Sequence, residues 1–186
     1  MRALIVVDVQ NDFCAGGAAP VPGGAAVAGA ISAYLGHDHG YRHLVATQDY
    51  HIEPGAHFCA QPDYVSCWPP HCVAGSPGAD FHPDLDTSGI EAVFRKGAYD
   101  PGYSGFSGRD ETDTGLDAWL RDHDVDELDV AGIATDFCVC ATAEDAARAG
   151  FSTRVLLDLC AGAAPESTAV ALAELAAAGV DIVRGR

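Results

Sequence analysis

The chain has 186 residues, which is long enough for one domain with a sizeable core and short for two. Its formal net charge of −17 argues against binding to nucleic acid or to an anionic membrane surface. No apolar run approaches the roughly 18 residues that cross a bilayer, and the N-terminal sequence lacks a signal-peptide cleavage pattern. We therefore expect a cytoplasmic protein with a single domain over residues 1–186.

Predicted strands and helices alternate along the chain. The first strand is predicted in the continuous apolar run ALIVVDV, which is typical of a strand covered on both faces. Further strands are predicted at residues 43–49, 91–96, 127–134, 152–159 and 181–185, and helices at about residues 24–35, 116–123, 135–150 and 165–179. This alternation predicts an α/β fold of three layers, in which a six-stranded, mostly parallel sheet carries helices on both faces.

Four chemically active residues fall at the ends of predicted strands. Asp8, Asp49 and Lys96 each end a strand, and Cys138 begins the helix after the fourth strand. In parallel α/β folds, ligands bind outside the carboxyl ends of the strands, where the strand order switches. We therefore expect these four residues, which are far apart in sequence, to meet at one edge of the sheet.

Cys138 is a candidate nucleophile at the start of its helix. The helix dipole and the free backbone N–H groups there favour a thiolate and would hold the oxyanion of an acyl intermediate. No histidine follows Cys138, so Asp8 is the candidate base. Lys96 is the only lysine among ten basic residues, and its compact ammonium would stabilise both neighbours. A buried structural cysteine and a hydrogen-bonding aspartate remain the alternatives.

A segment of about residues 50–90 is rich in proline, glycine and histidine and shows no helical or strand periodicity. Long irregular loops in compact domains are usually functional. Asp49 and His51 are two residues apart, so in an extended chain they point to the same side. Histidine combined with carboxylate suits iron, manganese or zinc. The sequence therefore predicts a divalent metal site whose ligands are Asp49, His51, His57 and His71.

The seven cysteines do not form an obvious pattern. Their odd number and the absence of a C-x-x-C pair argue against a disulfide framework, and we expect most of them to be buried apolar residues. A structural zinc site at Cys59, Cys67 and Cys72 is an alternative use of the loop, although this spacing matches no zinc finger or ribbon.

Three aromatic residues flank the same edge of the sheet. Phe13 follows the first strand, Trp68 lies in the histidine-rich loop, and Tyr103 lies in the loop after the third strand. Each alone is compatible with ordinary packing. Together they suit a flat aromatic ligand, which would bind by stacking.

The motifs DVQNDF, D-x-H with later histidines, FRKGAY and GIATDFCV occur in this order along the chain. In combination they resemble the nicotinamidases/pyrazinamidases of the isochorismatase-like cysteine hydrolases, most closely the mycobacterial type, over essentially the whole chain. The resemblance implies a single isochorismatase-like hydrolase domain with a metal-binding loop region at about residues 50–90. It also implies hydrolysis of nicotinamide to nicotinate and ammonia through a cysteine thioester, in NAD salvage, and of pyrazinamide to pyrazinoate.

The resemblance further implies roles for individual residues. The catalytic triad would be Asp8, Lys96 and Cys138, and the oxyanion hole would be the N–H groups of Ala134 and Cys138, with a cis peptide before Ala134. The substrate pocket would be lined by Phe13, Trp68, Tyr103, Ile133 and Phe137. One metal ion, Fe²⁺ first and Mn²⁺ or Zn²⁺ as alternatives, would bind Asp49, His51, His57 and His71. The resemblance is consistent with a monomer.

Phe137 is a departure from the mycobacterial pattern, in which a histidine is expected beside the nucleophile. This leaves two alternatives open, namely a related cysteine amidohydrolase that acts on another small amide, and an inactive homologue that binds a metal or ligand. An isochorismatase in the strict sense is disfavoured, because that branch lacks the nucleophilic cysteine.

Overall fold

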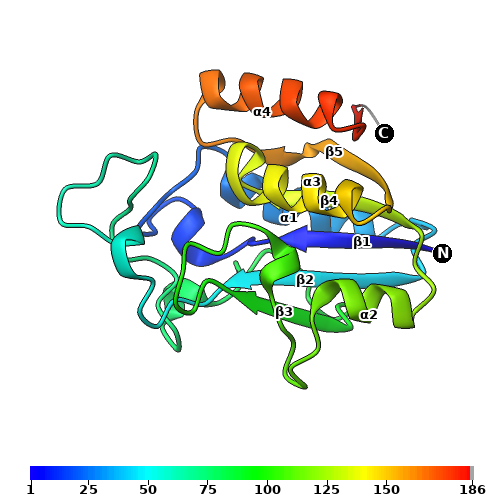
Figure 1. Ribbon diagram of the computed structural model, residues 1–186, viewed down its shortest axis with the longest axis horizontal. Coiled ribbons are helices and arrows are strands. Elements are labelled where there is room, and N and C mark those ends of the chain that lie inside the picture. Colours follow the sequence, from blue (N-terminus) through cyan, green and yellow to red (C-terminus); the bar gives the residue numbers. More distant parts are fainter. Residues whose placement is uncertain (185–186) are drawn as a thin grey trace.

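The computed structural model describes residues 1–184 and contains a six-stranded sheet with the order β3-β2-β1-β4-β5-β6 (Figure 1). The strands are β1 Arg2–Val7, β2 His43–Asp49, β3 Ala92–Lys96, β4 Glu127–Ile133, β5 Ser152–Ala161 and β6 Asp181–Val183. Each neighbouring pair is parallel, so the sheet is parallel throughout rather than mostly so. The predicted last strand extended to residue 185, and residues 185 and 186 lie outside the described part of the chain.

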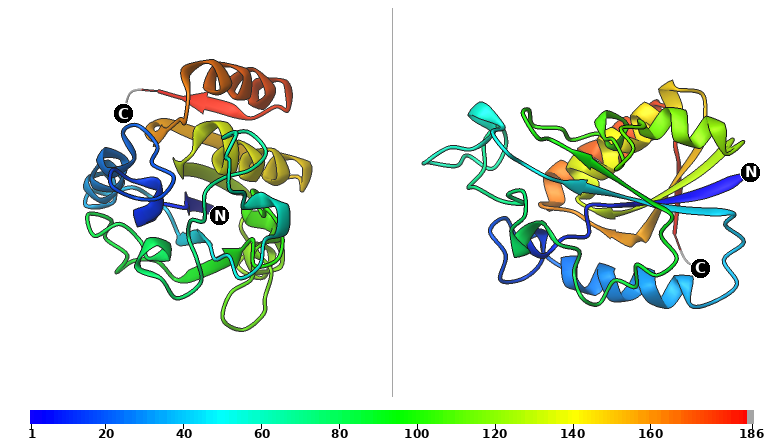
Figure 2. Two further views of the ribbon diagram at one scale, coloured as in Figure 1. Left: turned by 90° about the vertical axis from the view of Figure 1, so that its left-hand side faces the viewer. Right: turned by 90° about the horizontal axis from the view of Figure 1, so that it is seen from below.

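Helices cover both faces of the sheet, which confirms the three-layer prediction. Helix α1, Gly24–Leu35, lies on one face. Helices α2, Leu116–Asp122, α3, Cys140–Arg148, and α4, Pro165–Ala177, lie on the other face, as Figure 2 shows from below. None of the helices in residues 1–184 has both the length and the apolar character to cross a membrane.

The position of β1 inside the sheet, between β2 and β4, explains why its sequence is continuously apolar. Ala3, Ile5 and Val7 belong to the core under α2, α3 and α4, whereas Leu4 and Val6 belong to the core under α1. All five side chains are fully buried. A strand covered on both faces buries alternate residues on opposite sides, so it shows no polar alternation.

The carboxyl ends of the strands point toward the loop-rich end of the molecule, at the left of Figure 1. Between β2 and β3 the chain forms a long irregular segment whose helical parts are two short 3₁₀ turns, Gly55–His57 and Pro77–Ala79. This segment and the loops after β1, β3 and β4 meet at the same edge. The functional residues predicted from the sequence therefore gather there.

Candidate active site

Asp8 directly follows β1 and is completely buried. Its φ of 48° is in the left-handed region, which non-glycine residues adopt only where the surroundings fix them. The Thr47 hydroxyl donates a hydrogen bond of 2.6 Å to Oδ1 of Asp8, and the Lys96 Nζ lies 2.7 Å from Oδ2. Both carboxylate oxygens are thus held in place by neighbouring strands.

Lys96 ends β3 and joins the other members of the cluster. Its Nζ lies 2.7 Å from Asp8, 2.5 Å from Oδ1 of Asp49 and 3.6 Å from Sγ of Cys138. The side chain has no solvent exposure. The structure therefore brings together the four residues that the strand-end argument placed at one edge.

The protonation of this cluster follows from burial and charge. Burial raises the pKa of Asp8, although the Lys96 ammonium acts in the opposite direction. Burial also opposes the charge of Lys96, but the carboxylates of Asp49 and Asp8 outweigh it and raise the Lys96 pKa well above its ordinary value. The pKa of Asp8 is raised whereas that of Asp49 is lowered, so Asp8 is the more readily protonated of the two carboxyl groups that contact the ammonium.

Burial raises the pKa of the Cys138 thiol well above its ordinary value, and the lowering effect of Lys96 does not offset it. The carboxylates of Asp8 and Asp49 raise this pKa further. Burial and the two carboxylates therefore oppose the thiolate that the helix start is expected to favour. The Asp8 carboxylate beside the sulfur can accept the thiol proton.

Cys138 lies in a single π-helical turn, Thr135–Val139, that connects β4 to α3. The peptide bond between Ile133 and Ala134 is cis, as the resemblance implied. The Asp136 carboxylate accepts hydrogen bonds of 2.8 and 3.2 Å from two backbone N–H groups just before α4. These bonds tie the cysteine-bearing turn to the neighbouring helix and fix its position relative to the sheet.

A second cluster consists of three buried histidines from the loop after β2. His51, His57 and His71 each offer a ring nitrogen within 4.8 Å of the others. Nδ1 of His51 donates a hydrogen bond of 2.5 Å to the Gly97 carbonyl, and Nδ1 of His71 donates one of 2.8 Å to the Pro69 carbonyl. Each bond places the proton on Nδ1 and leaves the Nε2 lone pair available to a metal.

The residues of this cluster fit a divalent metal ion. Nε2 of His51 and Nδ1 of His57 are buried and have no hydrogen-bond partner within residues 1–184. Burial, together with His71 and His51, lowers the pKa of His57 to about 4, so its imidazole is neutral. Burial raises the pKa of Asp49, but Lys96 and His51 outweigh it and bring the pKa to about 2. Oδ2 of this carboxylate lies 3.7 Å from Nε2 of His51. Neutral imidazoles beside a carboxylate are ligands for divalent transition metals.

A cavity of about 390 Å³, its mouth included, opens beside both clusters. Its lining is mostly apolar with a few polar groups, which is typical of small-molecule sites. Its lining includes Phe13, His57, Trp68, Tyr103, Phe137 and Cys138. Ile133 is not part of this lining, and its side chain is fully buried in the core under α1, so its role in the substrate pocket stays a prediction.

Aromatic rings form one wall of the cavity. Phe137 lies edge-on to Trp68 with ring centroids 5.1 Å apart, and its ring centroid is 5.7 Å from that of Tyr103. The Trp68 indole N–H donates a hydrogen bond of 3.2 Å to the Tyr103 hydroxyl. Phe13 lies elsewhere on the lining, 5.4 Å from the ring of His71. The wall suits a flat ring that packs against aromatic surfaces.

A family model described as the isochorismatase domain matches residues 2–185 of the chain. The chain belongs to the isochorismatase family. The nicotinamidase/pyrazinamidase of Mycobacterium tuberculosis is 63% identical over 183 residues, which are 98% of this chain and 98% of that relative. The nicotinamidase of Escherichia coli is 40% identical over 201 residues, covering 97% of this chain and 93% of that relative.

Solved structures of family members share the fold. A structure of PnC1 from L. infantum in complex with nicotinate has a TM-score of 0.87 and 38% identity, and covers 99% of this chain and 92% of that chain. A structure of the pyrazinamidase of Pyrococcus horikoshii in complex with zinc has a TM-score of 0.82 and 38% identity, and covers 99% of both chains. The isochorismatase-like fold expected from the resemblance is confirmed.

Some residues that support the family's site geometry here were not predicted. Thr47 orients Asp8, and it shares a face of β2 with Asp49, so strand alternation was a usable signal. The Gln10 side-chain amide donates a hydrogen bond of 2.8 Å to the Asp49 backbone carbonyl and accepts one of 2.9 Å from the Asp49 backbone N–H. The Asp12 carboxylate accepts a hydrogen bond from the Cys72 N–H. These last contacts follow from loop geometry and have no signature in the sequence.

The expectation that the cysteines form no disulfide is wrong. Cys59 and Cys67 form a disulfide with a Cα–Cα distance of 5.8 Å, which also rules out the alternative of a zinc site at these residues and Cys72. A bridge between Phe58 and Trp68 brings the two ends of the loop together, and neither cysteine spacing nor an odd count reveals that pairing. The cysteines that remain free are Cys14, Cys72, Cys138, Cys140 and Cys160.

Proposed function

We propose that this chain is a nicotinamidase/pyrazinamidase, which hydrolyses nicotinamide to nicotinate and ammonia and pyrazinamide to pyrazinoate. The observation that carries the proposal is the position of Cys138, which opens onto an aromatic cavity while its sulfur lies 3.6 Å from the Lys96 ammonium. Identity of 63% to the nicotinamidase/pyrazinamidase of Mycobacterium tuberculosis supports it. The nicotinate formed would enter NAD salvage, in the cytoplasm, from a monomeric enzyme.

The reaction begins with the Cys138 thiol, Asp8 and Lys96. Asp8 accepts the thiol proton as the sulfur attacks the carboxamide carbon, and the raised pKa of Asp8 suits a base. Lys96 stabilises the negative charge that remains, since its ammonium contacts both the carboxylate and the sulfur. The dry surroundings strengthen each of these interactions.

The tetrahedral intermediate needs donors for its oxyanion. The backbone N–H groups of Ala134 and Cys138 serve in this role: Cys138 lies in the first turn of a helix, where backbone donors lack intrahelical partners, and Ala134 directly precedes that turn. Asp8 then passes its proton to the leaving nitrogen, and ammonia departs. Water hydrolyses the thioester that remains and releases the carboxylic acid and the free thiol.

The substrate ring binds in the aromatic part of the cavity. Phe13, Trp68, Tyr103 and Phe137 provide flat apolar surface, and shape and stacking hold the ring near Cys138. His51, His57, His71 and Asp49 hold one divalent metal, for which we propose Fe²⁺. When bound, this metal supplies a Lewis acid for a ring nitrogen and so orients the substrate.

Metal removal is the first prediction for this site. Dialysis against a chelator is expected to abolish ammonia release from nicotinamide, and anaerobic Fe²⁺ is expected to restore more activity than Mn²⁺ or Zn²⁺. His71→Ala is expected to lower the metal content from about one ion per chain to a small fraction, because buried ligands are needed together. Elemental analysis of the purified protein measures this content without relying on turnover.

His123→Ala provides the matched control for the metal measurement. His123 stacks on Trp119 at a centroid distance of 3.7 Å, in the segment that follows α2, so its loss is expected to leave the metal content unchanged. Full metal occupancy in His71→Ala would show that the ion binds elsewhere.

The test of the proposed function is ammonia release from nicotinamide by the metal-loaded protein, followed by identification of nicotinate. Release of both products supports the proposal. Absence of both, with metal bound, refutes it and leaves the two alternatives, a different small amide or a protein that binds without catalysis. A screen of aromatic and aliphatic amides for ammonia release separates these alternatives.

A further inference from the structure

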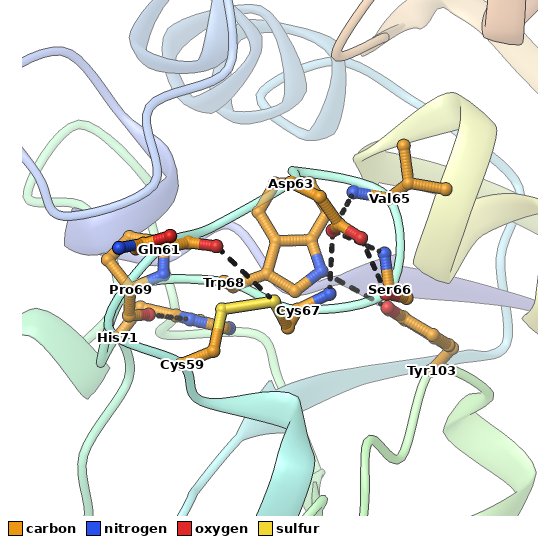
Figure 3. Close-up of a disulfide and its surroundings, with 10 residues drawn as sticks. All are labelled: Cys59, Gln61, Asp63, Val65, Ser66, Cys67, Trp68, Pro69, His71 and Tyr103. Atoms are coloured by element: carbon orange, nitrogen blue, oxygen red, sulfur yellow. Dashed lines mark hydrogen bonds between the residues drawn. A yellow bond between two sulfur atoms is a disulfide. The ribbon is translucent and has the colours of Figure 1, made fainter.

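The chain between Cys59 and Cys67 forms a loop that projects from the loop-rich end of the molecule (Figures 1 and 3). Its tip is open to solvent, with exposed fractions of 57% for Tyr64 and 73% for Val65. The Asp63 carboxylate accepts hydrogen bonds of 2.8 to 2.9 Å from three backbone N–H groups that follow it in the loop. In the part of the chain that the structure describes, the hydrogen bonds of Asp63 remain within the loop.

The base of the loop is attached to the functional site. The backbone N–H of Trp68 donates a hydrogen bond of 2.8 Å to the His57 carbonyl. The backbone N–H of Cys59 donates one of 3.0 Å to the Trp68 carbonyl. The disulfide closes the loop at this same place, because Cys67 directly precedes Trp68. The base therefore carries one predicted metal ligand and one cavity residue.

Trp68 points from this base into the site. Its indole N–H donates a hydrogen bond to the Tyr103 hydroxyl (Figure 3). Its ring lies edge-on to Phe137, and it is part of the cavity lining. The ring of Tyr64, in the loop, lies edge-on to the same indole with ring centroids 5.7 Å apart. The position of the indole thus depends on contacts with both the cavity wall and the loop.

We propose that the Cys59–Cys67 disulfide positions Trp68 in the substrate cavity, so that both cysteines are positioning residues whose reduction lowers substrate affinity. The proposal rests on the proposed function, since it takes Trp68 to be part of the surface against which the substrate ring packs. It adds a redox dependence that the triad and the metal cluster do not require.

The physical reason is the cost of ordering a loop. With the disulfide intact, a short covalent ring fixes the residue next to Trp68. With two thiols, the segment is held by the two backbone hydrogen bonds at its base, the bonds to Asp63 within the loop, the Trp68–Tyr103 hydrogen bond and ring contacts. Without the covalent link the solvent-exposed loop gains freedom that substrate binding must remove. This cost appears in KM, because the indole packs beside the substrate and does not touch the triad. Disulfides are reduced in the cytoplasm and persist in oxidising surroundings, so both forms are chemically accessible.

The kinetic test compares the oxidised protein with its reduced form and with the Cys59→Ser/Cys67→Ser double variant. A water-soluble trialkylphosphine reduces the disulfide to two thiols, while the phosphorus is oxidised to the phosphine oxide with an oxygen from water. Reduction or the double substitution is expected to raise the KM for nicotinamide about tenfold and to change kcat by less than about twofold. Elemental analysis confirms equal metal content in the samples compared.

The double variant is also the control for the reductant. It retains Cys138 and the other free cysteines, so any effect of the phosphine outside the disulfide appears there too. Cys160→Ser, a substitution in β5, is expected to keep the oxidised KM and the response to the phosphine. Alkylation of both Cys59 and Cys67 in the untreated protein, seen by mass spectrometry, would overturn the proposal because no disulfide would exist.

A readout that does not need turnover is the fluorescence of Trp68. The chain has two tryptophans, and Trp119→Phe leaves Trp68 as the only one. Trp119 packs against Phe94 and His43, which do not line the cavity. In this background, reduction is expected to shift the Trp68 emission to longer wavelength and to increase quenching by acrylamide.

The two readouts separate failure of this proposal from failure of the proposed function. If the oxidised parent does not hydrolyse nicotinamide, the proposed function fails, and fluorescence still decides whether the disulfide positions Trp68. An unchanged emission and unchanged quenching after reduction would overturn the positioning role. A tenfold fall in kcat at constant KM would also overturn it, since that result indicates damage to the reacting groups.

Discussion

Cys138→Ala is expected to lower kcat/KM for nicotinamide by at least about 10⁴-fold, because removing the atom that forms the covalent bond removes the function of the whole cluster. The alanine variant should stay folded, since Cys138 belongs to the core under α2, α3 and α4 and the methyl group is smaller than the thiol side chain. Ammonia release from the parent and the variant measures the effect. Nicotinate binding by calorimetry shows whether the cavity has survived.

Cys140→Ala is the matched control for this experiment. Cys140 begins α3 two residues later and is buried, but its Sγ faces the Ala171 carbonyl of α4 at 3.9 Å rather than the cavity. We expect a rate close to that of the parent, with a modest fall in melting temperature. If both variants lose activity equally, the assignment of Cys138 as the nucleophile is wrong.

The strand-end argument succeeded for a physical reason. In a parallel sheet the carboxyl ends of all strands lie along one edge, so residues that end different strands must meet. Asp8 after β1, Asp49 at the end of β2 and Lys96 at the end of β3 are far apart in sequence. In the structure the Lys96 ammonium lies 2.7 Å from the Asp8 carboxylate and 2.5 Å from that of Asp49. Hydrophobic pattern alone was enough to place them.

The protonation of Cys138 was beyond the sequence. A local rule, the helix dipole, favours a thiolate, whereas burial and the nearby carboxylates raise the pKa of the Cys138 thiol. Burial and charge depend on what surrounds the sulfur, and here the carboxylates come from the end of β2 and the residue after β1, while the ammonium comes from β3. Contributions from three separate segments have opposite signs, and their balance is known only from the assembled site.

Loop residues were the other gap. Ile133 ends a strand next to the cis peptide, yet its side chain packs under α1 and not in the cavity. Cys59 and Cys67 pair because the chain on either side of their loop is joined by backbone bonds between His57 and Trp68. Such contacts arise from irregular backbone, which has no period that a sequence pattern can reveal.

Lys96→Arg is expected to lower kcat/KM for nicotinamide by about 10³-fold although the positive charge is kept. The Lys96 ammonium is fully buried and fits between Asp8 at 2.7 Å, Asp49 at 2.5 Å and Cys138 at 3.6 Å. A planar guanidinium is larger and presents a fixed fork, so it cannot occupy this space without moving a carboxylate or the sulfur. The measurement is kcat/KM, with the melting temperature recorded for each variant.

Arg95→Lys is the reciprocal control, because it makes the opposite exchange at the neighbouring position of β3. Arg95 is exposed and lies over the ring of Tyr50 at 4.5 Å, outside the cluster, so its replacement is expected to leave kcat/KM nearly unchanged.

Lys96→Met separates charge from size. It leaves two buried carboxylates without their cation and is expected to cost about 3–5 kcal/mol of stability. Activity near that of the parent in Lys96→Arg would mean that only the charge of Lys96 matters, and the compact ammonium would lose its place in the mechanism.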